Sequence, residues 1–146
     1  MVTMEAPRLF SRMRARRADG VDGPAGDLFD PNCPTRLVLD RIGDKWTALV
    51  VLLLSDGKMR FSELRAHLGA VAPKVLTQTL RRAERDGLVS REVFAEVPPR
   101  VDYTLTDLGG SLINPIAVIG DWAEAHLPEI TAAQAAYDAR SAGAER

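Results

Sequence analysis

The chain has 146 residues, of which 46% are hydrophobic and 27% are charged. This length accommodates one domain of ordinary size, and the composition excludes global disorder and fibrous architectures. The longest apolar run, Ala48 to Leu54, is far shorter than the roughly 20 residues that span a bilayer. We therefore expect no membrane segment, no secretory signal at the N-terminus and a cytoplasmic location.

Charge is unevenly distributed along the chain, although the formal net charge is only −1. Residues 34–105 contain 12 Lys and Arg against 9 Asp and Glu, whereas residues 106–146 contain 2 against 6. Residues 1–32 are rich in Arg, Gly, Asp and Pro without sustained apolar periodicity, which predicts a flexible arm. The first 20 residues carry a net charge of +3, so this arm is either a solvated tail or a segment that touches DNA phosphates.

Four helices are predicted before residue 88. Cys33-Pro34 begins one that runs to about Ile42. Asp44 begins a second that runs through Ser55 and is apolar on nearly all sides, so we expect it to be buried nearly all round. Apolar residues at helical spacing predict a short third helix over residues 61–68. A fourth helix begins at Pro73 and ends at Asp86-Gly87.

After Gly87 the hydrophobic period changes from 3.6 to 2, which predicts strands over residues 88–94 and 101–105 joined by a loop that contains Pro98-Pro99-Arg100. Thr106-Asp107 then caps a long helix to about His126, interrupted at Pro115, and a last helix follows Pro128. This order of elements is typical of a winged helix-turn-helix. We expect a mainly α fold with a small β-wing (α+β), flanked by N- and C-terminal dimerisation helices.

The helix from Pro73 has two chemically different faces. Val75, Leu76, Leu80 and Ala83 recur at helical spacing and are expected to face the core. The opposite face is polar or basic, with short side chains near its start for base edges and long cations farther along for phosphates. The predicted DNA-binding residues of this helix are Lys74, Thr77, Gln78, Arg81, Arg82 and Arg85.

The loop between the two strands offers a further candidate. Prolines stiffen it, and a stiff loop presents an arginine to a minor groove or a phosphate at little entropic cost. Arg100 is the candidate, and the alternative is a rigid turn whose arginine is incidental.

Several short motifs occur in one order along residues 33–127, and together they resemble the HxlR-type regulators. The resemblance implies a homodimeric bacterial transcription regulator related to the MarR type, with the helix from Pro73 in the major groove and the 94–101 loop as the wing. It also implies dimerisation through the first helix and the C-terminal helices. Ala72 departs from the serine that the family usually has there. The motifs are Cys33-Pro34, Ile42-Gly43-Asp44-Lys45-Trp46, Arg60-Phe61-Ser62-Glu63-Leu64, Pro73-Lys74-Val75-Leu76-Thr77-Gln78, Asp86-Gly87-Leu88-Val89, Val97-Pro98-Pro99-Arg100-Val101 and Tyr103-Thr104-Leu105-Thr106-Asp107-Leu108-Gly109.

Composition supports a dimer independently. The helix after Thr106 carries two apolar stripes, whereas a domain of this size has one core to bury against, so one stripe needs a partner. A two-fold dimer would bind an inverted-repeat operator, with recognition helices about 34 Å apart. We divide the chain into the arm (1–32), the winged domain (33–127) and a dimerisation-associated helix and tail (128–146). The predicted dimer interface comprises Leu37, Ile113, Ile116, Ala117 and Gly120.

The single cysteine, Cys33, excludes an intramolecular disulfide. It lies at a helix N-terminus with Arg36 and Arg41 within two turns, and both features favour the reactive thiolate. Cys33 is therefore either a sensor modified by a small oxidant or electrophile, as in several HxlR-type proteins, or a small capping or packing residue.

Other function classes have less support. Cys33-Pro34-Thr35-Arg36 resembles the thiol motif of glutaredoxin-like enzymes but lacks the preceding strand. His67 and His126 have no spacing that fits catalysis or metal binding. We expect no catalytic residue, metal or cofactor, and a repressor that acts in the cytoplasm, associated with the nucleoid when bound to DNA. A winged helix that binds protein instead of DNA is the remaining alternative.

Overall fold

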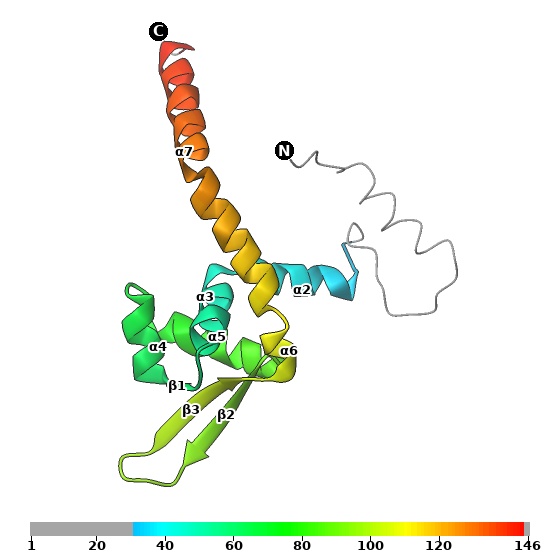
Figure 1. Cartoon of the computed structure of the whole chain (residues 1–146), viewed down its shortest axis with the longest axis vertical. Coiled ribbons are helices and arrows are strands. Elements are labelled where there is room, and N and C mark those ends of the chain that lie inside the picture. The colour runs from blue at the N-terminus through cyan, green and yellow to red at the C-terminus, as the bar shows by residue number, and fades with distance from the viewer. Residues whose placement is uncertain (1–30, 145–146) are drawn as a thin grey trace, which may run out of the picture. The chain divides into compact units, whose positions relative to one another are not determined.

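The computed structural model describes residues 31–144. The predicted arm, residues 1–32, lies outside the described residues except at its last two positions. The chain divides into two compact units, residues 1–40 and 41–146, which are considered separately. The helices and strands follow the predicted order (Figure 1), and the mainly helical fold with one small antiparallel sheet confirms a winged helix-turn-helix. The elements are α2 (Pro34–Gly43), α3 (Lys45–Leu54), β1 (Met59–Arg60), α4 (Phe61–Leu68), α5 (Pro73–Arg85), β2 (Val89–Phe94), β3 (Arg100–Leu105), α6 (Asp107–Gly110) and α7 (Ile113–Ala144).

Helix α3 is the centre of the second unit. Asp44 caps it: its carboxylate accepts hydrogen bonds from the Thr47 backbone N–H at 3.3 Å and from the Thr47 hydroxyl at 2.9 Å. Val50 and Leu54 are buried, but Leu49 is 40% exposed. The expectation that this helix is buried nearly all round is therefore wrong on the side that Leu49 occupies.

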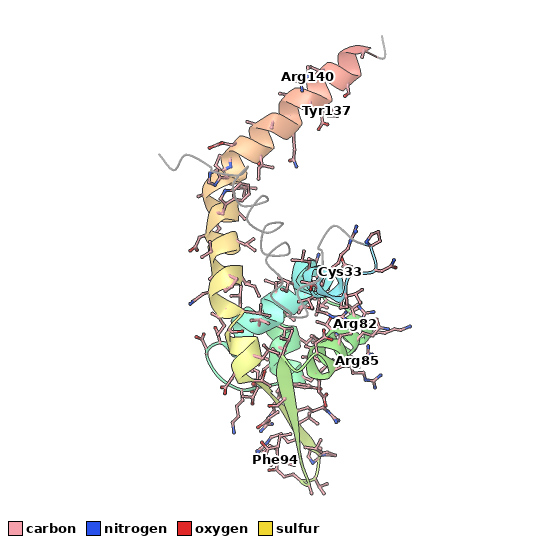
Figure 2. All side chains as sticks on the ribbon, turned by 90° about the vertical axis from the view of Figure 1, so that its right-hand side faces the viewer. Cys33, Arg82, Arg85, Phe94, Tyr137 and Arg140 are labelled. Atoms are coloured by element: carbon pink, nitrogen blue, oxygen red, sulfur yellow. The ribbon has the colours of Figure 1, made fainter. Side chains whose placement is uncertain are left out.

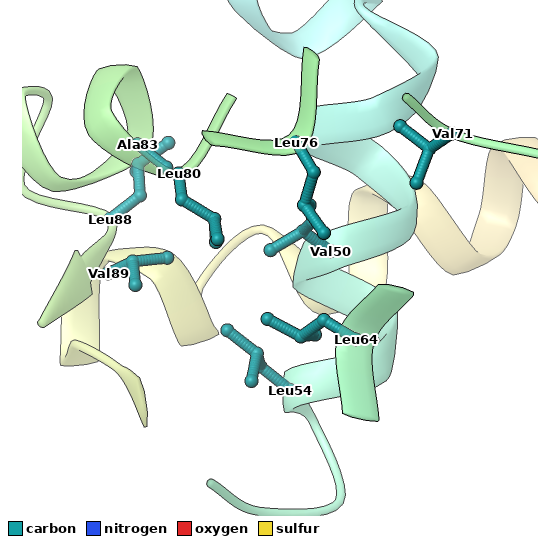
Figure 3. Packing of buried hydrophobic residues seen from close by; sticks show 9 residues of the cluster. All are labelled: Val50, Leu54, Leu64, Val71, Leu76, Leu80, Ala83, Leu88 and Val89. Atoms are coloured by element: carbon teal, nitrogen blue, oxygen red, sulfur yellow. The ribbon is translucent and has the colours of Figure 1, made fainter. Parts of the chain in front are cut away.

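The core is a cluster that joins α3 to α4, α5 and the start of the sheet. Figure 3 shows α3 side chains facing leucines of α4 and α5, with Leu88 and Val89 closing the cluster where the chain enters β2. Burial of these aliphatic side chains holds α5 against α3 and so determines which side of α5 faces outward. The cluster comprises Val50, Leu54, Leu64, Val71, Leu76, Leu80, Ala83, Leu88 and Val89.

The sheet has three antiparallel strands in the order β1-β3-β2. The two predicted strands are present, with Val89 opposite Leu105 and Phe94 opposite Arg100. Strand β1 was not predicted, because two residues are too few for an alternating pattern to be recognised. It pairs Arg60 with Asp102 and places β3 in the centre of the sheet.

A tight junction after β3 closes the winged unit. The Thr106 hydroxyl donates to the Gly87 carbonyl at 2.5 Å and accepts from the Gly109 N–H at 3.0 Å. Gly109 packs so closely that a Cβ atom there would lie 2.0 Å from the carbonyl oxygen of Leu88. Only glycine fits this position.

The C-terminal helix differs from the prediction. The break falls between Gly110 and Ile113, and α7 then runs without interruption to Ala144 with Pro128 inside it. Pro115 lies in the first turn of α7, where an N–H has no helical partner to lose. The predicted interruption at Pro115 and the separate helix after Pro128 are therefore wrong, because one internal proline costs a hydrogen bond without ending an alanine-rich helix.

Candidate nucleic-acid interface

One side of α5 faces the core and thereby orients the other. Leu76, Thr79, Leu80 and Ala83 are buried, and the Thr79 hydroxyl donates to the Val75 carbonyl at 2.9 Å. Val75 was expected on this side but is 37% exposed. At about 100° per residue, Leu76 and Ala83 lie in the middle of the buried side and Thr79 lies at its edge. Val75 lies about 40° beyond Thr79, outside the buried side.

The six polar residues predicted to contact DNA lie together on the outward side of α5. All are exposed except Thr77, which is half-buried, and Figure 2 shows Arg82 and Arg85 extending from the helix into solvent. The Thr77 hydroxyl donates to the Pro73 carbonyl at 2.8 Å. Toward a base edge, Thr77 therefore has only an acceptor lone pair or its methyl group to offer.

The cations of α5 have no ionic partner in the part of the chain that the structure describes. Among residues 31–144, no ion pair involves Lys74, Arg81, Arg82 or Arg85, whereas Arg41, for example, pairs with Asp86 at 2.5 Å. Like charges spaced by four residues, as in Arg81 and Arg85, repel each other along a helix. A row of unneutralised cations on one face creates the positive potential that a polyanion relieves.

Arg100, the predicted wing contact, is instead held within the hairpin. Its guanidinium lies 4.0 Å from the centre of the Phe94 ring, its Nη1 lies 3.3 Å from Oε1 of Glu96, and its side chain is only 25% exposed. Figure 2 shows Phe94 at the end of the hairpin that lies away from the helices. This environment follows from the cross-strand pairing of Phe94 with Arg100, which a reading of the loop alone cannot anticipate.

The second ionic partner of Arg100 is Asp102, a buried carboxylate on the central strand. Its side chain is 7% exposed, and its oxygens lie 3.7 Å from Nζ of Lys58, 3.9 Å from Nε of Arg60 and 3.5 Å from Nε of Arg100. Three cations compensate the desolvation of one carboxylate, which is the condition for burying it. This cluster joins β1, β3 and the base of the loop. It cannot be predicted from the sequence without β1, whose two residues carry no recognisable strand pattern.

The sheet also contributes side chains that border the outward side of α5. A cavity of about 250 Å³ lies between α5 and strands β2 and β3, lined by Thr77, Arg81, Glu84, Arg91 and Tyr103. Arg91 and Tyr103 lie directly opposite each other in the β2–β3 ladder. No local pattern in the sequence points to either residue, since only this register brings them together.

Cys33 is 5% exposed. Of the two arginines expected to favour its thiolate, Arg36 is exposed and Arg41 forms the ion pair with Asp86.

Among residues 31–144, no group of three or more His, Cys, Asp or Glu side chains could hold a metal ion. His67 is exposed, and His126 stacks on Trp122 at a centroid distance of 4.6 Å.

The predicted dimer residues fall into different environments. Ile116 is 7% exposed within the single chain and so has little surface left for a partner, and its assignment to the interface stays a prediction. Ile113 and Ala117 are half-buried and Gly120 is exposed. In the other unit, Leu37 is 69% exposed.

Beyond Ile116, α7 exposes large apolar side chains along most of its length. Ile119, Trp122, Ile130 and Tyr137 are spaced by about one or two helical turns, which places them in one stripe. Trp122 and Tyr137 are 56% and 64% exposed. Among residues 31–144, no helix is long and apolar enough to cross a membrane.

Comparison with known proteins gives one consistent result. The model of the HxlR-like helix-turn-helix family matches residues 41–131. The HTH-type transcriptional regulator YtfH of Escherichia coli is 41% identical over 107 residues, which cover 73% of this chain and 85% of YtfH. The solved structure of the transcriptional regulator ytfH of Salmonella typhimurium is 40% identical with a TM-score of 0.71, and the match covers 75% of this chain and 97% of that one.

A redox regulator, HypR, solved in its reduced form, is 36% identical with a TM-score of 0.63, and the match covers 68% of this chain and 98% of HypR. The residues matched by the family model include α5, with its outward row of cations, and the sheet beside it. The chain belongs to the HxlR-like helix-turn-helix family and is a transcriptional regulator of the helix-turn-helix type.

Proposed function

We propose that this regulator acts as a homodimeric repressor, with α5 of each copy in a major groove of an inverted-repeat operator. The observation that carries the proposal is the outward side of α5, where four cations lie without ionic partners among the described residues. A surface helix that only needs solubility usually mixes acids with bases. A helix that meets DNA gains from every cation that releases a counterion on binding.

The two halves of α5 are proposed to contact different parts of the DNA. Lys74, Thr77 and Gln78 lie in its first half, which is the part of a recognition helix that contacts base edges. Arg81, Arg82 and Arg85 lie in its second half, where long side chains reach phosphates. Arg100 is no longer a proposed contact, since its partners within the hairpin already engage it.

The proposed dimer rests on the exposed apolar stripe of α7. Isolated apolar side chains on a surface need no explanation, but a stripe that continues over several turns of one helix is typical of an interface. A second copy of the same chain is the simplest partner, because a two-fold axis lets identical helices cover each other. The interface proposed here comprises Ile119, Trp122, Ile130 and Tyr137.

Cys33 is the proposed site of the signal, with a small oxidant or electrophile as the effector. The matched structure of the redox regulator HypR supports this class of signal. Because the Cys33 side chain is 5% exposed, the reagent must be small or the start of α2 must open transiently. Treatment with oxidant should weaken operator binding by the wild type and leave Cys33→Ser unaffected. Equal weakening of both proteins would remove Cys33 from the mechanism.

The experiment that tests the function is a fluorescence-anisotropy titration of the full chain with the duplex upstream of its own gene and with a scrambled duplex of equal length, at several salt concentrations. The wild type should bind the first duplex more tightly, and both affinities should fall steeply with salt. Gln78→Ala should reduce the difference between the duplexes, whereas Arg82→Ala should weaken both alike. Absence of salt-dependent binding to either duplex would instead favour a winged helix that binds protein.

A further inference from the structure

The cavity between α5 and the sheet lies on one flank of the outward side of α5. Thr77, Arg81 and Glu84 are spaced by four and three residues and so share that flank, while Arg91 and Tyr103 face it from β2 and β3. Three elements that are distant in sequence thus line one hollow of about 250 Å³. We refer to this hollow as the α5–sheet notch.

The donors available in the notch are cationic or phenolic. Among residues 31–144, no ion pair engages Arg81 or Arg91, and the Tyr103 hydroxyl forms no hydrogen bond within this part of the chain. Thr77 adds no donor, because its hydroxyl donates to the Pro73 carbonyl. The notch therefore offers two guanidinium forks and one hydroxyl to a ligand that accepts hydrogen bonds and carries negative charge.

We infer that the α5–sheet notch binds a backbone phosphate of DNA, held jointly by Arg81 of α5 and Arg91 of β2. This inference rests on the proposed function and adds to it the residue through which the sheet contacts DNA. A tetrahedral phosphate matches guanidinium geometry from two directions at once. A guanine edge also accepts from arginine, but the notch lies on the flank of α5 and not at the centre of its outward side, which is the part that faces the bases. Glu84, which lines the notch, lies four residues from the buried Leu80 and so on this flank.

Glu84 provides a matched control, because its substitution is expected to change the DNA affinity in the opposite direction. Its carboxylate lies in the same cavity as both arginines and opposes a bound phosphate. Removing its charge with Glu84→Gln should therefore strengthen binding to every sequence, whereas Arg91→Gln should weaken it. A variant that merely disturbed the fold would weaken binding in both cases.

The test uses the full chain in the same anisotropy titration, with the operator duplex and its scrambled counterpart. Arg91→Gln should weaken binding to both by about tenfold at 0.1 M salt and reduce the salt slope by about 0.9, the contribution of one phosphate. Arg81→Gln should behave alike. The double variant should lose less than the product of the two single losses, because both arginines serve one phosphate.

Controls separate this inference from the proposed function. Arg140→Gln changes an exposed arginine near the end of α7 and should leave affinity and slope unchanged. One outcome would overturn the phosphate site in the notch and leave the proposed function standing. In that outcome the wild type binds DNA and Arg82→Ala binds it more weakly, but Arg91→Gln has the affinity and salt slope of the wild type. Loss confined to the operator would also overturn it, since that result indicates a base contact. If the wild type itself shows no salt-dependent binding, the proposed function fails first.

Discussion

The Nε atom of Arg100 lies 3.5 Å from Oδ1 of Asp102, two residues farther along β3. Residues spaced by two share one face of a strand, so the pair is a local consequence of the extended backbone. The separation is that of an ion pair without hydrogen-bond geometry. Since Lys58 and Arg60 approach the same carboxylate, the arginine that the sequence assigned to a DNA groove belongs to the cluster that anchors the wing.

Asp102→Asn should lower the free energy of unfolding by about 2 kcal/mol, because it leaves three cations around a neutral and largely buried amide. Urea denaturation measures the change. Arg100→Gln should destabilise less, since two cations remain. The double variant should be less destabilised than the sum of the two, and strict additivity would show that Arg100 and Asp102 do not interact.

Arg100→Gln should also leave the salt dependence of DNA binding nearly unchanged, because the guanidinium already has partners within the hairpin. Arg82→Gln, which removes an exposed cation without an ionic partner, should reduce the slope by about 0.9. The two slopes are compared by anisotropy between low and moderate salt. An equal reduction for both variants would restore Arg100 as a phosphate contact.

Gly109→Ala should destabilise the fold by about 3 kcal/mol, because its Cβ would lie 2.0 Å from the Leu88 carbonyl oxygen. That oxygen cannot move freely, since it accepts a hydrogen bond from the Thr106 N–H at 3.1 Å. The neighbouring Gly110 has no atom within 4 Å of an added Cβ. Gly110→Ala should therefore be neutral or stabilise by about 0.5 kcal/mol, and similar melting points for the two variants would contradict this account.

Ala72→Ser should stabilise the protein by about 1 kcal/mol. Ala72 occupies the N-cap of α5 with extended backbone angles and makes no side-chain cap hydrogen bond, so a serine hydroxyl could accept from a first-turn N–H there. Ala70→Ser, at an exposed position two residues earlier, is the control and should change little. Thermal denaturation distinguishes them, and equal effects would mean that the cap is not the cause.

Ile119→Glu should convert the proposed dimer into monomers, because it places a charge in the middle of the exposed apolar stripe of α7. Ala135→Glu adds the same charge on the other side of the helix. Sedimentation velocity over a range of concentrations reports the oligomeric state. A dimer that survives Ile119→Glu would exclude the α7 stripe as its interface.

The sequence by itself determined the local elements and the faces of α5. Pro73 and the pair Asp86-Gly87 delimit that helix, Gly87 has a positive φ of 75°, and the 3.6-residue period separates the buried side from the polar one. These signals act between residues a few positions apart, so one chain suffices to recognise them. The family resemblance extended the same information to the order of all the elements.

Tertiary structure alone decided which side chains remain available. It buried Ile116, engaged Arg100 through Phe94 and Asp102, and brought Arg91 and Tyr103 beside Arg81. It also lets α7 continue through Pro128, although a proline within a helical pattern locally predicts the end of a helix. The physical reason is that burial and pairing depend on strand register and packing between residues far apart in the chain, and no local period encodes them.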